Sequence, residues 1–269
     1  PSDRWESGGI RNYHWREVAS GTGFGTIVDA RDPNYGYAMS QAGKLIRFEL
    51  STGERKQIPP WAPETSPLRF NWNAPLATDP HDPGVIYYGS QFVHKSVDRG
   101  DTWQIISADL TTNDPQKQSQ DQSGGLTRES TGAENHTTIV TVAPSPLERD
   151  VIWAGTDDGN VQLTRSGGGQ WENLTGRMDA VPAGAWVAHI EPSKFNAGAA
   201  FAVFDDHRRG NREAYVYRTD DYGRRWRRIA DEDDIEGFVH IVRQDPIAEG
   251  LLFAGTEFGL YMSLNGGED

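Results

Sequence analysis

The chain has 269 residues, of which 36% are hydrophobic, and it carries a formal net charge of −13 with no cysteine. This charge argues against a nucleic-acid partner, because phosphate binding needs a basic surface. The missing cysteines exclude disulfides, thiolate nucleophiles and cysteine-ligated zinc. No apolar run approaches the roughly 20 residues of a membrane-spanning helix, so membrane insertion is not expected.

Five short apolar segments centred on an aromatic residue recur along the chain and predict buried β-strands. Each follows a proline-rich or glycine-rich turn. Their central residues lie at intervals of 50, 66, 48 and 52 positions, and self-similarity at this period in strands indicates β-propeller blades. The central residues are Tyr37, Tyr87, Trp153, Phe201 and Phe253.

The predicted fold is therefore all-β, a propeller of four-stranded antiparallel blades, about five of them in this chain. The interval of 66 residues indicates an insertion at 109–135, which is rich in Gln, Ser and Thr. Long loops of this kind in compact domains are usually functional or disordered. The expected blade repeats are approximately 24–58, 73–107, 137–175, 186–230 and 238–269.

A short motif between the third and fourth strands of a blade occurs four times. It places Ser or Thr two residues before Asp or Asn, then Gly two residues on and Trp three further. The Ser, Thr, Asp and Asn side chains can accept hydrogen bonds from the N–H groups of a turn, and Gly can adopt a positive φ. The Trp begins the next strand and packs against the core. This spacing resembles the Asp box of sialidase-like propellers, and we expect a structural role for its acids. The copies are Ser96, Asp98, Gly100 and Trp103; Thr164, Gly168 and Trp171, with Ser166 at the Asp position; Thr219, Asp221, Gly223 and Trp226; and Ser263, Asn265 and Gly267.

The two ends of the chain allow two interpretations. Residues 14–18 contain Trp15-Arg16-Glu17-Val18, which resembles the start of a fourth strand and is a possible closing strand beside Tyr261–Ser263. Alternatively the chain is a piece of a longer propeller, which we favour. Open blade edges then need further blades or another chain to cover them.

Six segments of the chain carry a resemblance to a known family, namely 69–73, 79–83, 95–103, 107–114, 155–159 and 255–260. In these segments the chain resembles a large bacterial family of sortilin (VPS10-type) or BNR-repeat "glycosyl hydrolase-like" propellers. The resemblance implies a propeller exported to the periplasm, the cell surface or the medium, with its signal peptide outside this chain. The label "hydrolase" rests on the fold, which does not imply function.

Candidate functional residues lie on the face that carries the long loops. One repeat position, at the turn between the second and third strands, holds an amide or a carboxylate in every blade. Trp72, Glu134, His136, Trp186 and His240 are expected near the starts of the inner strands, with Asp206 and His207 after a second strand. The residues at the repeat position are Gln41, Gln91, Asp157, Asp205 and Glu257.

Each of these residues also has a structural interpretation. Trp72 and Trp186 are often blade-packing aromatics. Asp157 starts an Asp-Asp-Gly sequence typical of tight turns. His136 with Glu134 can anchor a loop by a hydrogen bond. Asp205, Asp206 and His207 form the densest titratable cluster.

Three functions fit the sequence. The first is a non-catalytic module that binds a protein or glycan on the loop-bearing face or acts as a scaffold subunit. The alternative is a glycoside hydrolase, which needs two carboxylates about 5–5.5 or 6.5–9.5 Å apart. The candidates for these carboxylates are Asp157, Asp205 and Glu257. The Phe/Tyr-Arg-Ile-Pro motif that marks sialidases is absent, which argues against this function. A metal-assisted hydrolase using His136, His207 or His240 ranks last, and we expect no metal or cofactor.

Overall fold

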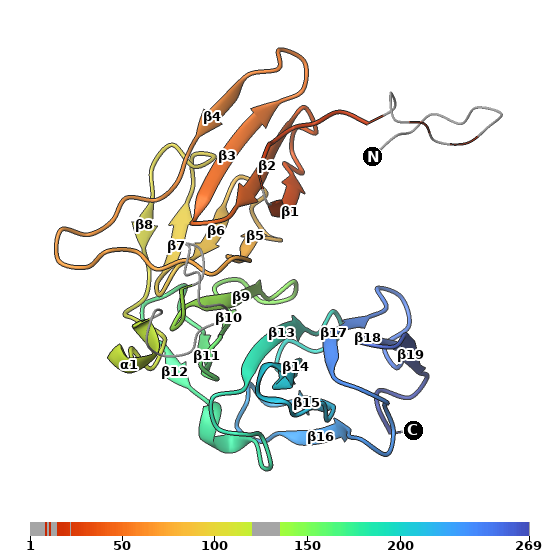
Figure 1. Ribbon diagram of the computed structural model, residues 1–269. Helices are drawn as coiled ribbons and strands as arrows, with labels where there is room; N and C mark the ends of the chain where they lie inside the picture. The colour runs from red at the N-terminus through yellow and green to blue at the C-terminus, as the bar shows by residue number, and fades with distance from the viewer. Residues whose placement is uncertain (1–8, 10, 12–14, 22, 120–134, 269) are drawn as a thin grey trace.

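The structure is a computed structural model that describes residues 9, 11, 15–21, 23–119 and 135–268. It is all-β, as predicted, with five antiparallel sheets that each form one propeller blade (Figure 1). The blades are β1 (Gly23–Val28), β2 (Tyr35–Ser40), β3 (Lys44–Glu49) and β4 (Arg55–Gln57); β5 (Leu76–Thr78), β6 (Ile86–Gly89), β7 (Val93–Ser96) and β8 (Gln104–Ile105); β9 (Ile139–Pro144), β10 (Ile152–Thr156), β11 (Val161–Thr164) and β12 (Glu172–Asn173); β13 (Trp186–Pro192), β14 (Ala200–Asp205), β15 (Tyr215–Thr219) and β16 (Arg227–Ala230); and β17 (Val239–Gln244), β18 (Leu252–Thr256) and β19 (Leu260–Ser263). The described residues also form three short helical segments, namely α1 (Pro115–Gln118), η2 (Thr175–Arg177) and η3 (His207–Arg209).

The hydrophobic core is divided among the junctions between neighbouring blades. Along β10, the side chain of Trp153 packs towards the fourth blade, whereas Ile152 and Ala154 pack towards the second. Alternate residues of a strand point to opposite faces of the sheet, so a short apolar run fills two junctions at once. Each blade is therefore stabilised only by its neighbours.

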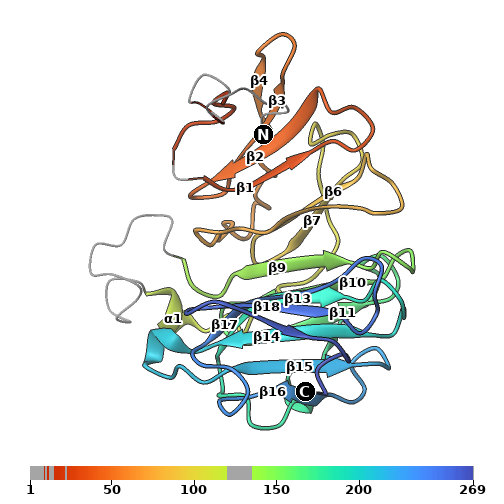
Figure 2. The ribbon, with the colours of Figure 1, turned by 90° about the vertical axis from the view of Figure 1, so that its right-hand side faces the viewer.

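The inner strands β1, β5, β9, β13 and β17 pack side by side in chain order. Figure 2 shows β9 and β13 next to each other. Every blade begins with its inner strand and continues outwards, so the inner strands all start at the same end of the propeller. The loops that precede these strands therefore gather on one face.

The repeated turn motif folds through its side chains. In the second blade, the Gly100 N–H donates to Ser96 Oγ at 2.8 Å and the Thr102 N–H donates to Asp98 Oδ1 at 2.8 Å. In the third blade Ser166 Oγ replaces the carboxylate and accepts from the Gln170 N–H at 2.9 Å. A hydroxyl is thus enough for this turn.

Each of these turns also packs closely against the end of the outer strand of the preceding blade. A Cβ placed on Gly100 would lie 2.4 Å from Ile58 Cδ1, and one on Gly168 would lie 2.4 Å from the Ile106 carbonyl oxygen. Glycine is needed at these turns because of this close approach as well as the positive φ.

We expect Gly168→Ala to lower the free energy of unfolding by more than about 1 kcal/mol. Its φ of +103° disfavours a side chain, and the Ile106 carbonyl that it would meet belongs to a backbone that cannot rotate away. Gly176→Ala is the matched control, because no atom lies within 4 Å of its Cβ position; it should change stability by less than about 0.5 kcal/mol. Urea unfolding of the three proteins measures the difference, and equal midpoints would contradict the account.

Arg16 and Glu17 of the possible closing strand contact the first blade. Arg16 Nη1 donates to the Leu50 carbonyl, and Arg55 Nη2 donates to the Glu17 carbonyl at 2.7 Å. Pairing with Tyr261–Ser263 is not seen, because β19 pairs with β18 alone within the described part of the chain. No described helix is long and apolar enough to cross a membrane.

Candidate functional site

The five inner strands enclose a cleft of about 1020 Å³. Most of its lining residues are apolar, with the polar Thr141 and His189 among them, and its charged side chains lie towards the two ends. A cavity of this size fits an extended small-molecule or oligomeric ligand. Its lining includes Phe24, Ile27, Leu76, Val140, Ala188 and Ile241 in the middle, Trp72, Trp186, Asp205, Arg208 and His240 at one mouth, and Glu191 and Arg243 at the other.

Two tryptophans stand at the mouth where the inner strands begin. Trp72 precedes β5 and meets the Phe24 ring edge-on at a centroid distance of 6.2 Å. Trp186 is the first residue of β13; the Arg208 guanidinium lies 3.7 Å from its ring centroid, and His136 meets it edge-on at 6.3 Å. Both indoles are half-buried and line the cleft. They therefore offer flat apolar surfaces of the kind that bind sugar rings.

Asp205 is the carboxylate at this mouth. It ends β14, directly opposite Trp186, and it is buried apart from its contact with the cleft. Asp205 Oδ1 accepts from the His207 N–H at 3.0 Å and lies 2.6 Å from His207 Nδ1, and Oδ2 accepts from Arg208 Nη1 at 3.4 Å. These charge-assisted contacts fix the carboxylate in position.

Glu191 is the carboxylate near the other mouth. It accepts from Lys194 Nζ at 2.7 Å and from Arg243 Nη1 at 2.6 Å. It pairs with Phe201 of β14, four residues before Asp205, so its backbone lies about 13 Å along the strand from that of Asp205. That separation is too long for the two carboxylates of one glycosidase centre.

Asp157 occupies the same repeat position as Asp205, but it is completely buried and does not line the cleft. Its oxygens accept from Thr138 N at 2.8 Å, Thr138 Oγ1 at 2.6 Å and Asn71 Nδ2 at 3.2 Å. Burial raises the pKa of Asp157 to about 7, and the neighbouring Asp158 adds to the effect, while the hydrogen bonds from Thr138 and Asn71 oppose it. Asp157 thus ties together the loops that precede β5 and β9.

We expect the stability difference between Asp157→Asn and the parent to depend on pH. The unfolded carboxyl loses its proton near pH 4, whereas the folded one keeps it to about pH 7. The parent therefore loses stability as the pH rises from about 4 to 7, by at most about 4 kcal/mol, and the uncharged variant does not. Chemical unfolding at pH 4 to 8, with exposed Asp233→Asn as control, tests this; a difference that stays constant across the range would contradict it.

Of the remaining predicted residues, Gln91, Asp206 and Glu257 form hydrogen bonds or ion pairs with neighbouring groups. Gln91 is buried; it accepts from the Arg69 N–H at 2.9 Å and donates to the Pro67 carbonyl at 2.9 Å. Glu257 accepts from Arg212, and Asp206 accepts from Arg209. Gln41 lies half-buried in the β2–β3 turn. Glu134 lies outside the described residues.

The three histidines of the metal hypothesis lie in two groups. His207 stacks on Phe238 at a centroid distance of 4.2 Å, and His240 meets the same ring edge-on at 4.7 Å. His136 instead contacts Trp186, and burial lowers its pKa. Within the described parts of the chain, no group of three or more His, Cys, Asp or Glu side chains could hold a metal ion.

Two contacts of the candidate site are not indicated by the repeat pattern. Arg208 covers a face of Trp186, and Glu191 pairs with Arg243 of the next inner strand. The position of Arg208 in the sequence, directly after the Asp205–His207 cluster, could have indicated it as a site residue. The Glu191–Arg243 pair joins residues 52 positions apart, and no local pattern indicates it.

No protein-family model matches the chain. Over 110 residues, 39% of its length, the chain is 33% identical to the oligoxyloglucan-reducing end-specific xyloglucanase of Emericella nidulans, and the match spans 13% of that enzyme. A solved GH74 xyloglucanase from Xanthomonas campestris superposes with a TM-score of 0.54 at 18% identity, covering 94% of this chain and 46% of the other. The chain thus spans less than half of either enzyme. It is a β-propeller that resembles a GH74 xyloglucanase in fold and, over one segment, a xyloglucanase in sequence.

Proposed function

We propose that this chain is a glycan-binding propeller of a glycoside hydrolase that acts on a xyloglucan-type glucan. The observation that carries the proposal is the cleft of about 1020 Å³ with Trp72, Trp186 and Asp205 at one mouth. Two indoles supply flat apolar surfaces for sugar rings, and the carboxylate can accept from sugar hydroxyls. The similarity to xyloglucanases supports this alternative over the non-catalytic scaffold that ranked first in the sequence analysis.

Among the predicted catalytic candidates, Asp205 is the one that lines the cleft, and we assign it the acid–base role. Asp157 is assigned to loop anchoring because it is completely buried. Glu257 is held by Arg212 and lies outside the cleft lining. Export, a sortilin-type relationship and a protein partner remain predictions from the sequence resemblance.

Binding without cleavage is the second candidate function. The observation that favours it is the spacing of the two cleft carboxylates, Asp205 and Glu191, whose backbones lie about 13 Å apart along β14. Hydrolysis needs a second carboxylate within about 10 Å of Asp205, whereas binding needs only the tryptophans and the cleft.

The test of the proposed function is affinity for xyloglucan oligosaccharides by calorimetry. Trp186→Ala and Trp72→Ala should each weaken binding about tenfold, because an aromatic contact of about 1–1.5 kcal/mol is lost. Trp61→Ala, which removes an 85% exposed indole outside the cleft, is the control and should bind like the parent. Equal affinity in all four proteins would contradict the site, and release of reducing ends separates hydrolysis from binding alone.

A further inference from the structure

Three inner strands, β9, β13 and β17, carry a β-bulge at the same place. In each of them the pairing with the next strand shifts by one residue, so that one residue has no partner across the ladder. Bulges re-aim side chains and are over-represented next to functional sites. The extra residues are Val140, Ala188 and His240, and all three line the cleft. The bulges thus shape the wall of the cleft.

His189 follows the bulge of β13 and lies between the two mouths of the cleft. It pairs with Val203, two residues before Asp205 on β14, so its backbone is about 7 Å along the strand from that of Asp205. Val203 belongs to the core between the fourth and fifth blades. Directly paired residues point to the same side of a sheet, so the imidazole lies at this junction, where it lines the cleft.

The two ring nitrogens of His189 have different surroundings. Nδ1 is enclosed and has no hydrogen-bond partner among the described residues. Nε2 is not enclosed, so it is the polar atom that this side chain presents to the cleft. A neutral imidazole carries one N–H, and buried N–H groups without an acceptor are rarer in proteins than buried acceptors without a donor. The proton therefore belongs on Nε2, which makes this atom a donor to the cleft.

The imidazole is also uncharged at neutral pH. Burial lowers the pKa of His189 to about 3, and the cations Arg243 and Lys194 add to the effect. Both cations pair with Glu191. An uncharged N–H donor does not select an anion, but it can donate to a hydroxyl or ether oxygen, the acceptors that a neutral sugar carries.

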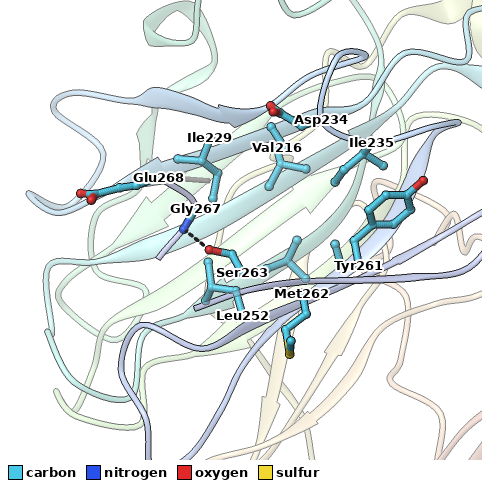
Figure 3. Close-up of a pocket in the computed structure, with 13 residues that line it drawn as sticks. Val216, Ile229, Asp234, Ile235, Leu252, Tyr261, Met262, Ser263, Gly267 and Glu268 are labelled. Atoms are coloured by element: carbon cyan, nitrogen blue, oxygen red, sulfur yellow. Dashed lines mark hydrogen bonds between the residues drawn. The ribbon is translucent and has the colours of Figure 1, made fainter. Parts of the chain in front are cut away.

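A smaller cavity lies between the same two blades, beside β19 (Figure 3). Its volume of about 190 Å³ is below the roughly 300 Å³ of ordinary ligand sites. Its Ser263 hydroxyl already accepts from the Gly267 N–H at 2.9 Å and donates to Asn265 Oδ1 at 3.0 Å. A ligand at this junction is therefore expected in the cleft, where Nε2 of His189 is accessible.

We propose that His189 is a specificity-determining residue of the cleft, and that its Nε2–H donates to an oxygen of an uncharged glycan bound there. This inference rests on the proposed function, because it needs the glycan to lie in the cleft. A sugar ring that stacks on Trp186 at one mouth places the next part of the glycan beside His189 on the same strand.

The first test is calorimetry with xyloglucan oligosaccharides on the intact chain and two variants. His189→Leu should weaken binding about three- to tenfold, because one hydrogen bond to the ligand is lost. His189→Gln is the matched control, since its amide N–H can reach the position of Nε2, and its affinity should stay within about twofold of the parent's. Urea midpoints should be equal in the parent and His189→Leu, because leucine removes an enclosed nitrogen that has no partner.

The second test is nitrogen NMR of the labelled parent protein, which needs no substitution in the molecule that is measured. The spectrum of His189→Gln assigns the His189 signals. At neutral pH the free protein should show the proton on Nε2, and the Nε2 resonance should move when the oligosaccharide is added. A ring that only fills space would keep this resonance unchanged.

Three results would overturn this inference and leave the proposed function standing. One is affinity like the parent's in His189→Leu while Trp186→Ala weakens binding. Another is an equal loss of affinity in the leucine and glutamine variants, because the ring would then act by its shape. The third is a proton on Nδ1. A parent protein that binds no oligosaccharide would overturn the proposed function as well.

Discussion

Asp205→Asn is expected to slow hydrolysis of xyloglucan by about 10²- to 10⁴-fold, the usual contribution of an acid–base group. Asparagine keeps an oxygen for the His207 N–H, which now bonds at 3.0 Å, but it cannot take up or release a proton. Affinity for the oligosaccharide should change much less than kcat, because Trp72 and Trp186 remain. Initial rates of reducing-end release over a range of substrate concentrations separate kcat from KM.

Glu232→Gln is the control for the loss of a carboxylate. Its side chain is 57% exposed and pairs with Arg228 beyond β16, outside the cleft lining. The control should match the parent in kcat and KM. An Asp205→Asn protein as fast as the parent would remove Asp205 from the catalytic role and leave the cleft as a binding site.

Trp153→Ala is expected to lower the free energy of unfolding by about 3–5 kcal/mol. Trp153 is completely buried and packs between the third and fourth blades, edge-on to Trp226 at 5.9 Å. Because each blade depends on its neighbours, the cavity weakens a whole junction. Chemical unfolding followed by circular dichroism measures the loss.

Two further variants, Trp153→Phe and Trp61→Ala, are the controls for this loss of stability. Phenylalanine restores most of the apolar contact. It also removes an indole N–H that has no hydrogen-bond partner among the described residues, so its cost should be clearly smaller than that of alanine. The exposed Trp61 should be replaceable with a change of less than about 0.5 kcal/mol. A loss of less than 1 kcal/mol for Trp153→Ala would contradict the junction model of stability.

The architecture was predictable because it repeats. The aromatic strands around Tyr37, Tyr87 and Trp153 and the turns at Gly100 and Gly223 each carry a local pattern, and five imperfect copies reinforce one another. The all-β propeller fold was confirmed on this basis. Pairing partners of the chain ends are not encoded in this way, and Trp15–Val18 contacts the first blade instead of β19.

The exposure of the candidate site residues could not be predicted from the repeat. Asp157 and Asp205 share one repeat position, yet Asp205 lines the cleft and Asp157 is buried. The difference comes from Asn71 and Thr138, which belong to neighbouring loops and cover Asp157. A repeat determines the backbone position of a residue. The burial of its side chain depends on the irregular loops that cover it, and the repeat pattern does not include these loops.

A crystal structure of the chain with a bound xyloglucan oligosaccharide tests the central claim most directly. We predict sugar rings in the cleft, with one ring stacked about 4 Å from the Trp186 or Trp72 indole and a hydroxyl within hydrogen-bond distance of Asp205. An oligosaccharide bound elsewhere, with the cleft between the inner strands empty, would contradict it.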